Sequence, residues 1–365
     1  MNFFELGLSR ELLKATEKFS EPTKIQELII PKILTGGSWI GQAPTGTGKT
    51  LAYLLPAFEK IDAKKNFSQV LILSPTYELA MQTAKTAREI ATAAESEIKI
   101  QSLIGGANIE RQIDSLKKNK PQMIVGSVGR ILELNRKGKL KLSGVKILVL
   151  DEFDRLLDDE NFEMVQAVVK LLPKEFDCLM FSATANKKSI KRAEIFNKPT
   201  LIKVELDEKF ATARENYFVV ADFRDKISVL AKLVRRLPIR RGLVFINKNF
   251  DVNKTLEKLR WENLKVASLI GTADKTSRKN SLADFRSGKV QLLLSTDLAA
   301  RGLDIDEIDF VVNLDFPDDE HIYLHRAGRT ARAGVGGKVL TLADKKELPK
   351  IEKFSKKLNI KFAKL

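Results

Sequence analysis

The stretch SWIGQAPTGTGKTLAYLLPAF, residues 38–58, contains three successive patterns. A short apolar segment (38–42) precedes a glycine-rich loop (43–50), and a helical pattern of apolar residues begins at Leu51. Glycines let a backbone curl until successive N–H groups point at one centre, and the helix that follows adds its dipole. This order of strand, loop and helix predicts a loop that binds phosphate.

The residue types in this loop favour a magnesium nucleotide as the ligand. We expect Lys49 to reach the β- and γ-phosphates and the Thr50 hydroxyl to help hold Mg²⁺. The residues expected to contact the nucleotide here are Thr45, Gly46, Thr47, Gly48, Lys49 and Thr50.

A magnesium nucleotide also needs a carboxylate at the end of a neighbouring strand. The run at 145–150 is mostly apolar and leads into Asp151-Glu152-Phe153-Asp154. Asp151 would hold the metal through a water, and Glu152 would orient the attacking water and accept its proton. A guanine-reading Asn-Lys-x-Asp sequence fails at 247–250, where the fourth residue is Phe250, so nothing favours GTP. From these residues alone, a P-loop kinase is an open alternative.

The rest of the chain alternates short apolar runs with longer helical patterns, such as those at 51–61, 78–94 and 162–172. Continuous apolar strands separated by helices indicate parallel sheets covered on both faces. The fold class expected is therefore α/β, with two doubly wound parallel sheets in tandem. The expected strands are residues 38–42, 70–73, 98–104, 123–126, 147–150 and 178–181, then 217–220, 243–246, 265–270, 290–294, 310–313 and 338–342.

The chain length agrees with two domains, since 365 residues at about 150 per domain give two. Pro199 follows a helical pattern, a strand at 201–204 closes the first half, and 206–215 is polar without a strong period. We therefore predict one domain over 1–205, a short linker over 206–215 and a second domain over 216–365.

The charge balance points to a polyanionic partner. The chain has 63 Lys and Arg against 47 Asp and Glu, a formal net charge of +16, and nucleic acid is the first candidate for such an excess. A basic enzyme without a nucleic-acid partner is the alternative. The last stretch holds eight lysines around apolar residues at helical spacing, Leu348, Ile351, Phe354 and Leu358. We favour a closing helix with a solvated basic face, and a face that contacts RNA is the second interpretation.

Cysteine and histidine are too scarce for several chemistries. Cys178 is the one cysteine, which excludes an intrachain disulfide and a cysteine-based zinc cluster and favours a small core residue in a reducing compartment. His321 and His325 have the spacing of a metal pair on one helical face, but no third ligand is evident. The first residues carry Glu5 and lack a basic region before an apolar run, so we expect no signal peptide. No apolar segment approaches the length of a membrane span, and we expect a cytoplasmic location.

Further motifs follow in a fixed order. They are PTKIQ (22–26) with Phe3 upstream, PTYELA (75–80), GG (105–106), SVGR (127–130), SAT (182–184), TDLAARGLD (296–304) and HRAGRTAR (325–332). Together with the phosphate loop and Asp-Glu-Phe-Asp, they resemble the DEAD-box family of RNA-dependent ATPases in helicase superfamily 2. The resemblance runs from Phe3 to about Leu365 and implies two RecA-like domains.

The resemblance implies roles in the nucleotide site. Gln26 would hydrogen-bond the adenine edge, Phe3 would belong to the same subsite, and an aromatic ring would cover the base. Asp304 would meet the ribose. The family's arginine fingers, which reach the γ-phosphate when the domains close, would be Arg329 and Arg332.

The resemblance also implies residues for coupling and for RNA. Ser182, Thr184 and His325 would link hydrolysis to domain closure. The residues expected at the RNA backbone are Pro75, Thr76, Glu78, Gly106, Gly129, Arg130, Arg278 and Thr296. The departures from the family pattern affect RNA binding and coupling more than ATP binding. Phe153 replaces alanine, Tyr77 replaces an arginine, and Ala331 replaces a glycine. The others are Ser127 and Val128 in the TPGR element, Ile270 in place of a histidine, and Lys275 in place of the glutamine of QxxR.

The function implied is that of an ATP-dependent RNA helicase that separates short duplexes locally, with ATP and Mg²⁺ as ligands and little sequence preference. An ATP-gated RNA clamp with little unwinding is the alternative, and Phe153 and Tyr77 are its support. A DNA-directed motor is disfavoured by the PTKIQ and SAT elements, and a P-loop kinase by the arginines of the second half. We expect a monomer that binds single-stranded RNA or a short duplex. Compact members of this family commonly act in ribosome assembly or mRNA turnover, so the resemblance suggests ribosomal or mRNA-decay proteins as partners without favouring either.

Overall fold

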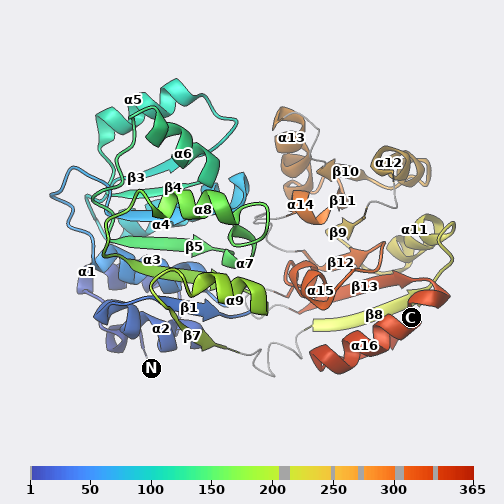
Figure 1. Cartoon of the computed structure of the whole chain (residues 1–365). Coiled ribbons are helices and arrows are strands. Elements are labelled where there is room, and N and C mark those ends of the chain that lie inside the picture. The colour runs from blue at the N-terminus through green and yellow to red at the C-terminus, as the bar shows by residue number, and fades with distance from the viewer. Residues whose placement is uncertain (1, 205–213, 248–250, 270–274, 301–307, 332–335) are drawn as a thin grey trace. The chain divides into compact units, whose positions relative to one another are not determined.

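The computed structural model describes residues 2–204, 214–247, 251–269, 275–300, 308–331 and 336–365 (Figure 1). The chain divides into two compact units, Met1–Glu205 and Leu206–Leu365. A seven-stranded parallel sheet forms the centre of each unit.

Unit 1 alternates strands and helices from its first strand to its last. The strands are β1 (Trp39–Gln42), β2 (Val70–Leu73), β3 (Ile100–Leu103), β4 (Met123–Gly126), β5 (Ile147–Asp151), β6 (Asp177–Ser182) and β7 (Thr200–Lys203). The α-helices are α1 (Arg10–Leu13), α2 (Lys24–Thr35), α3 (Lys49–Glu59), α4 (Tyr77–Ala93), α5 (Ile109–Asn119), α6 (Val128–Arg136), α7 (Phe153–Leu156), α8 (Phe162–Val169) and α9 (Lys187–Ala193), with short 3₁₀ turns at Phe4–Leu6 and Lys14–Thr16.

The strand order in unit 1 is β3-β4-β2-β5-β6-β1-β7, and the two faces of the sheet belong to different cores. Successive side chains of a strand point to opposite faces. Val70 and Ile72 of β2 accordingly pack in the core formed with α1 to α4, whereas Leu71 and Leu73 pack in the core formed with α5 to α9. Because an inner strand is covered on both sides, β2 and most of β5 are continuous apolar runs rather than alternating ones.

Unit 2 repeats this plan. Its strands are β8 (Arg214–Val220), β9 (Gly242–Phe245), β10 (Val266–Leu269), β11 (Leu292–Ser295), β12 (Phe310–Asn313), β13 (Gly337–Ala343) and β14 (Phe362–Lys364). Its α-helices are α11 (Lys226–Arg236), α12 (Val252–Trp261), α13 (Lys275–Arg286), α14 (Asp297–Ala300), α15 (Glu320–Ala327) and α16 (Leu348–Leu358), with a 3₁₀ turn at Lys345–Glu347. The order β10-β11-β9-β12-β13-β8-β14 matches that of unit 1 strand for strand. One face packs against α11 and α12, and the other against α13 to α16.

The predicted α/β class with two parallel sheets is confirmed, and each predicted strand overlaps an observed one. The predicted linker is wrong at its end. Of 206–215, residues 206–213 lie outside the described residues, and Arg214 and Glu215 belong to β8, where they pair with Gly337 and Lys338 of β13. When a strand begins with polar residues, as β8 does, its first residues lack the apolar pattern from which a strand is predicted.

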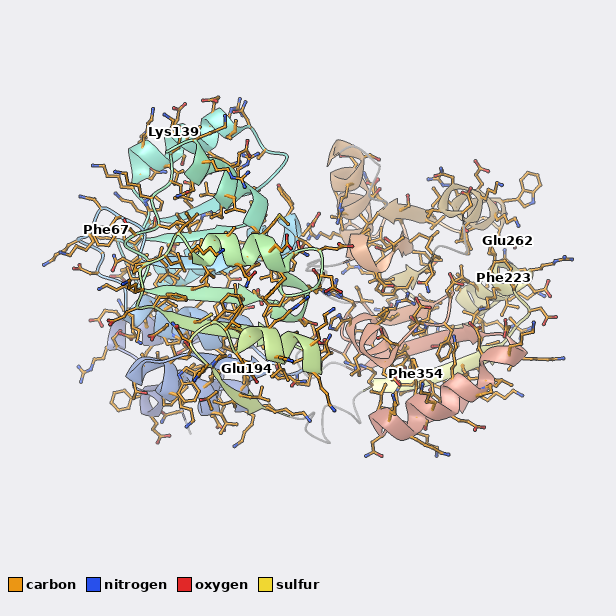
Figure 2. All side chains as sticks on the ribbon, viewed as in Figure 1. Phe67, Lys139, Glu194, Phe223, Glu262 and Phe354 are labelled. Carbon is orange, nitrogen blue, oxygen red and sulfur yellow. The ribbon has the colours of Figure 1, made fainter. Side chains whose placement is uncertain are left out.

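The closing helix is confirmed as α16. Its buried residues are Ile351 and Phe354, and the Phe354 ring, labelled in Figure 2, packs 5.1 Å from that of Phe316. Cys178 is buried as expected, and burial raises the pKa of its thiol. Among the described residues, no helix is both long enough and apolar enough to cross a membrane.

Candidate nucleotide and RNA site

The carboxyl ends of parallel strands lie at one edge of a sheet, and most of the predicted site residues of unit 1 follow those ends. The phosphate loop follows β1, Glu152 follows β5, and Thr184 follows β6. The predicted RNA-contacting segments follow β2, β3 and β4. In the strand order, β5, β6 and β1 are neighbours, and so are β3, β4 and β2. The predicted nucleotide residues and the predicted RNA residues therefore follow two separate groups of strand ends, which we call the nucleotide half and the RNA half of the edge after these predicted roles.

The phosphate loop has the backbone that its glycines predict. Gly46 and Gly48 have φ angles of 84° and 82°, a region that favours glycine. Thr45 and Gly46 form the turn, and α3 begins at Lys49, with Thr50 as its second residue. The Lys49 ammonium donates to the carbonyl oxygens of Ala43 (2.7 Å) and Pro44 (2.8 Å), so its charge lies over the loop. The hydroxyl of Thr47 also donates to Pro44, at 2.7 Å.

Gln26 lies against this loop. Its side-chain amide donates to the carbonyl oxygen of Gly48 (3.0 Å), and its own carbonyl accepts from the backbone N–H of Thr23 (2.9 Å). The residue is 2% exposed. Glutamine has two N–H donors and two acceptor lone pairs, so one of each is left for a ligand.

Phe3 lies deeper than its expected role suggests. It is 7% exposed, and its ring centroid lies 6.5 Å from that of Phe19, which is 39% exposed. Of the two rings, Phe19 presents the larger free surface, and Phe3 supports it from below. Phe19 is three residues before Pro22, and its proximity to the PTKIQ motif is the signal that could have singled it out.

Asp151, at the end of β5, is 5% exposed and accepts two hydrogen bonds. The donors are the phenol of Tyr53 (2.9 Å) and the backbone N–H of Glu152 (3.1 Å). Burial, with the neighbouring charge of Glu152, raises the pKa of Asp151 to about 7. The Tyr53 oxygen also lies 3.4 Å from the hydroxyl of Thr83 on α4, the helix that begins in the PTYELA motif.

The Tyr53 ring has its own support. It packs 5.2 Å from the ring of Phe181 on β6. Phe181 in turn occupies the space beside Gly41 on β1, where an added Cβ would lie 2.5 Å from its ring. Tyr53 and Thr83 were not singled out by the sequence, because a helical apolar pattern does not distinguish an aromatic core residue from one that holds a carboxylate.

Glu152 is the N-cap of α7 and has left-handed backbone angles (φ 51°, ψ 52°). For a residue with a side chain this conformation costs on the order of 1 kcal/mol. Its carboxylate lies 3.6 Å from the Arg155 guanidinium and is about a quarter exposed. Phe153, the residue that departs from the family pattern, is fully buried and points into the core beneath α7.

Asp154 links this loop to the SAT segment. Its two carboxylate oxygens accept hydrogen bonds from the hydroxyls of Ser182 (2.6 Å) and Thr184 (2.7 Å). The Ser182 hydroxyl also accepts from the backbone N–H of Thr184, at 3.1 Å. Two predicted coupling residues therefore share one carboxylate.

On the RNA half, short polar side chains shape the backbone. Thr76, after Pro75, is the N-cap of α4 and accepts from the N–H of Leu79 (3.3 Å), with Glu78 in the first turn. The N–H of Gly105 donates to the hydroxyl of Ser127 (3.4 Å), which brings the loops after β3 and β4 together.

Two glycines of the RNA half leave backbone accessible. Gly106 has a φ of 68°, and a Cβ on Gly129 would meet nothing within 4 Å. Arg130, predicted to contact RNA, is only 8% exposed, and its guanidinium donates to the carbonyl of Ala107 (3.2 Å). In this structure Arg130 supports the loop that begins at Gly105.

In unit 2, two predicted RNA residues meet at α14. Thr296 accepts from the N–H of Ala299 (3.3 Å), and the guanidinium of Arg278 donates to the carbonyl of Ala299 (2.7 Å). His325 is in α15, and Arg329 follows its end. The predicted Asp304 and Arg332 lie outside the described residues.

Arg326 is a residue that the sequence did not single out. It is 1% exposed, and two nitrogens of its guanidinium donate to the two carboxylate oxygens of Asp297, at 2.7 and 2.6 Å. It also donates to the side chains of Asn313 (3.1 Å) and Asn247. The TDLAARGLD and HRAGRTAR motifs are thus joined by an ion pair whose arginine is buried. The signal in the sequence was that HRAGRTAR holds a third arginine besides Arg329 and Arg332.

The residues of unit 1 fit a magnesium nucleotide. Thr50 and Asp151 supply the hydroxyl and carboxylate oxygens that Mg²⁺ prefers. The loop must lack a side chain at Gly48, because a Cβ there would lie 2.4 Å from the Gln26 amide nitrogen. Glycine at this position therefore lets the Gln26 amide lie directly against the loop.

Comparison with known proteins agrees with this geometry. Residues 23–193 match the DEAD/DEAH box helicase family, and residues 225–334 match the helicase conserved C-terminal domain. The chain is 40% identical to the DEAD-box ATP-dependent RNA helicase CshC of Bacillus cereus, over 97% of this chain and 90% of the relative. It is 39% identical to the probable ATP-dependent RNA helicase YfmL of Bacillus subtilis, over 94% of this chain and 91% of the relative.

Among solved structures, S. cerevisiae Dbp5 bound to RNA and ADP BeF3 is similar with a TM-score of 0.87 and 30% identity, over 100% of this chain and 95% of that one. Mss116p bound to ssRNA and AMP-PNP has a TM-score of 0.86 and 26% identity, over 100% of this chain and 78% of that one. The two sheets are therefore the tandem RecA-like domains of a superfamily 2 helicase. The chain belongs to the DEAD-box family of ATP-dependent RNA helicases, which confirms the family and enzyme class predicted from the sequence.

Proposed function

We propose that this chain hydrolyses ATP in response to RNA and uses the cycle to separate short RNA duplexes locally. The observation that carries the proposal is a contact between the two groups of predicted residues: the Tyr53 phenol donates a hydrogen bond to Asp151 and lies beside the hydroxyl of Thr83 on α4. Membership of the family supports ATP and RNA as ligands.

The nucleotide binds in unit 1. Backbone N–H groups of the phosphate loop and the Lys49 ammonium neutralise the phosphates. Gln26 uses its free donor and acceptor on the adenine edge, and Phe19, backed by Phe3, covers the base. Mg²⁺, held by Thr50 and Asp151, supplies positive charge to the phosphate oxygens when bound. Glu152 orients the attacking water and takes its proton.

Hydrolysis requires the second unit. Arg329 and Arg332 neutralise the charge that develops on the γ-phosphoryl group, and Asp304 meets the ribose. His325 acts toward the SAT segment, whose Ser182 and Thr184 share Asp154. Since ATP and RNA both favour the closed pair of domains, each ligand tightens binding of the other.

RNA binds through its backbone. The segments at Thr76, Gly106, Gly129, Arg278 and Thr296 contact phosphates and sugars, which carry no base identity, so sequence preference is weak. Arg130 acts through the glycine loop that it supports. The domains act as a monomer, and closure bends one strand so that its partner detaches.

The experiment measures ATP hydrolysis and duplex displacement side by side with the whole chain. Single-stranded RNA should raise kcat for ATP far more than single-stranded DNA of the same sequence, and ATP should release the short strand of an RNA duplex. Glu152→Gln should abolish both. Equal stimulation by DNA, or unchanged turnover in Glu152→Gln, would contradict the proposal.

A clamp with little unwinding is the second candidate, and the fully buried Phe153 favours it, because a bulky ring replaces the family's alanine next to the catalytic glutamate. RNA-stimulated hydrolysis without strand release would select this candidate. With either function, Phe153→Ala should leave a cavity in the core and lower the free energy of unfolding by about 3 to 5 kcal/mol.

A further inference from the structure

Trp261 is an unusually exposed aromatic residue. It ends α12 and is 89% exposed, whereas the other tryptophan, Trp39, is half-buried and donates its indole N–H to Gly36 (3.1 Å). An indole left in water forgoes the burial that normally makes tryptophan favourable in a fold. An exposed indole of this kind can gain stability when a ligand covers its ring, so we looked for groups beside Trp261 that would bind one.

The surroundings of Trp261 are basic. Three segments precede β9, β10 and β11: residues 235–241, 260–265 and 286–291, hereafter the basic edge. The first reads RRLPIRR, with four arginines and no acidic residue. In the described part of the chain, the side chains of Arg236, Arg240 and Arg260 are exposed and take part in no ion pair.

Hydrogen bonds hold the three segments of the basic edge together. The Arg235 guanidinium donates to the carboxylate of Glu262 (2.8 Å), the residue after Trp261 that is labelled in Figure 2. The amide side chain of Gln291 donates to the Ile239 carbonyl (2.6 Å), and its backbone N–H donates to the Lys265 carbonyl (2.8 Å). The segment that carries Trp261 is thus joined to the segment that carries Arg236 and Arg240.

The basic edge is separate from the predicted RNA contacts of the same unit. Thr296 follows the carboxyl end of β11, and the basic edge precedes the amino ends of β9, β10 and β11. Cations at helix C-termini also offset the helix dipole, which accounts for Arg235 and Arg236 at the end of α11. That effect does not account for Arg240, which lies beyond the helix, nor for a bare indole among the arginines.

We propose that Trp261 and the basic edge form a second RNA-binding surface, on which one unpaired base stacks on the indole while the arginines bind the flanking phosphates. Stacking on an aromatic ring tolerates any base, and arginines suit phosphate geometry. Single-stranded RNA is the occupant because each of its nucleotides combines an exposed base face with a negative phosphate. The proposal rests on RNA as the partner of the proposed function, and it adds a contact that needs no ATP.

The first test is fluorescence of the full chain with Trp39→Phe, which leaves Trp261 as the only tryptophan. Without nucleotide, an oligouridine of about 12 nucleotides should quench the emission, because a base stacks on the indole. Inorganic polyphosphate carries the charge without the bases, and it should compete for binding without quenching. Equal quenching by both, or no quenching by RNA, would overturn the proposal.

The second test is affinity. Trp261→Ala should weaken oligouridine binding without nucleotide by about tenfold, and Trp261→Phe by less, because a phenyl ring still stacks. Arg236→Glu with Arg240→Glu should weaken it further than the matched pair Lys353→Glu with Lys356→Glu on α16. Unchanged affinity in Trp261→Ala would contradict the proposal.

The two proposals fail in different ways. RNA-stimulated ATP hydrolysis at saturating RNA should be the same in Trp261→Ala and in the unaltered chain. Loss of a second surface would leave that activity intact, whereas an error in the proposed function would remove it from the unaltered chain as well.

Discussion

The two units share one strand order, yet they differ at the loop that follows the first strand of each. In unit 1 the loop before α3 is glycine-rich and α3 begins at Lys49, whereas in unit 2 the loop at 221–225 reads ADFRD and α11 begins at Lys226. Lys226 is 2% exposed, and its ammonium lies 3.2 Å from the carboxylate of Glu347. A lysine occupies the same place in both sheets, and in unit 2 an internal carboxylate provides the negative charge that phosphate is expected to provide in unit 1.

The fifth strand shows a parallel difference. β5 ends in the buried Asp151, whereas β12 ends in Asn313, a fully buried amide whose oxygen accepts from Arg326 (3.1 Å) and whose nitrogen donates to Thr341 (3.1 Å). The two residues are not at equivalent positions, since Leu150 and Asn313 are the residues that pair with the end of the second strand, at Leu73 and Phe245, and Asp151 lies one residue further on. The comparison teaches that each sheet places polar side chains at its carboxyl edge. In one copy they have the residue types of a nucleotide site, and in the other they stabilise the fold.

The largest expected effect separates the two lysines. Lys49→Ala should lower kcat for ATP hydrolysis on the order of 10²- to 10³-fold, because a charge that stabilises the transition state is lost, and should leave the free energy of unfolding nearly unchanged. Lys226→Ala should do the reverse. Its kcat should be normal, and its free energy of unfolding should fall by about 3 kcal/mol, because the Glu347 carboxylate loses the ammonium and keeps only the backbone N–H of Asp344. Kinetics and urea unfolding measure the two effects.

A double variant sharpens this test. Lys226→Met with Glu347→Gln should recover part of the lost stability, because no unpaired charge remains. Lys85→Ala, which removes an exposed lysine, is the control and should change neither property. A large loss of ATP hydrolysis in Lys226→Ala would break the contrast between the two units.

The next effect concerns Asp154. Asp154→Asn keeps the size of the side chain but cannot accept hydrogen bonds from both hydroxyls, so stability should fall by about 1 to 3 kcal/mol. The stimulation of ATP hydrolysis by RNA should fall more than the basal rate, since Ser182 and Thr184 are the predicted coupling residues. Measuring the rate with and without RNA gives the ratio. An unchanged ratio would limit Asp154 to a structural role.

A smaller effect follows from the pKa of Asp151. The folded chain without Mg²⁺ holds this proton up to a pH of about 7, whereas the unfolded chain releases it near a pH of about 4. The native state therefore binds more protons between these values, and the free energy of unfolding falls as pH rises, by roughly 1 kcal/mol per pH unit. Asp151→Asn should lose this slope in urea unfolding. A variant that keeps the slope would show that another group causes it.

The smallest effect is expected for Tyr53→Phe. Removing one phenol oxygen should cost about 1 kcal/mol of stability, because Asp151 loses a donor. Since that hydrogen bond lowers the pKa of Asp151, the variant's stability slope should extend to higher pH. Thr83→Val is the matched control on α4 and should change the slope less. Identical slopes in Tyr53→Phe and the unaltered chain would remove Tyr53 from the support of Asp151.

The sheets could be predicted from the sequence because buried parallel strands are short apolar runs between helices. β14 was not predicted, since its three residues lie at the edge of the sheet and are partly exposed. Arg214 and Glu215 were assigned to the linker because polar residues give no strand pattern. Local sequence patterns therefore predict that a strand exists, but they do not predict strand ends or edge strands that form only by pairing with a neighbouring strand.

The phosphate loop and the carboxylates follow from local motifs, so they could be placed on the sheet edge in advance. The contacts that support them join residues far apart in the chain, such as Tyr53 to Asp151 and Lys226 to Glu347. No spacing rule reveals such pairs. For the same reason, the burial of Arg130 and of Arg326 could not be read from motifs that present them as exposed charges.

The arrangement of the nucleotide half depends on the absence of a side chain at Gly41. Phe181 fills the volume that a side chain on Gly41 would occupy, Tyr53 packs on Phe181, and Asp151 accepts a hydrogen bond from the Tyr53 hydroxyl. A methyl group added at Gly41 would displace Phe181 and then Tyr53. It would therefore disturb the Asp151 carboxylate, although it does not touch that group. Substitutions in the sheet interior of this protein should therefore be judged by their effect on chemistry as well as on folding.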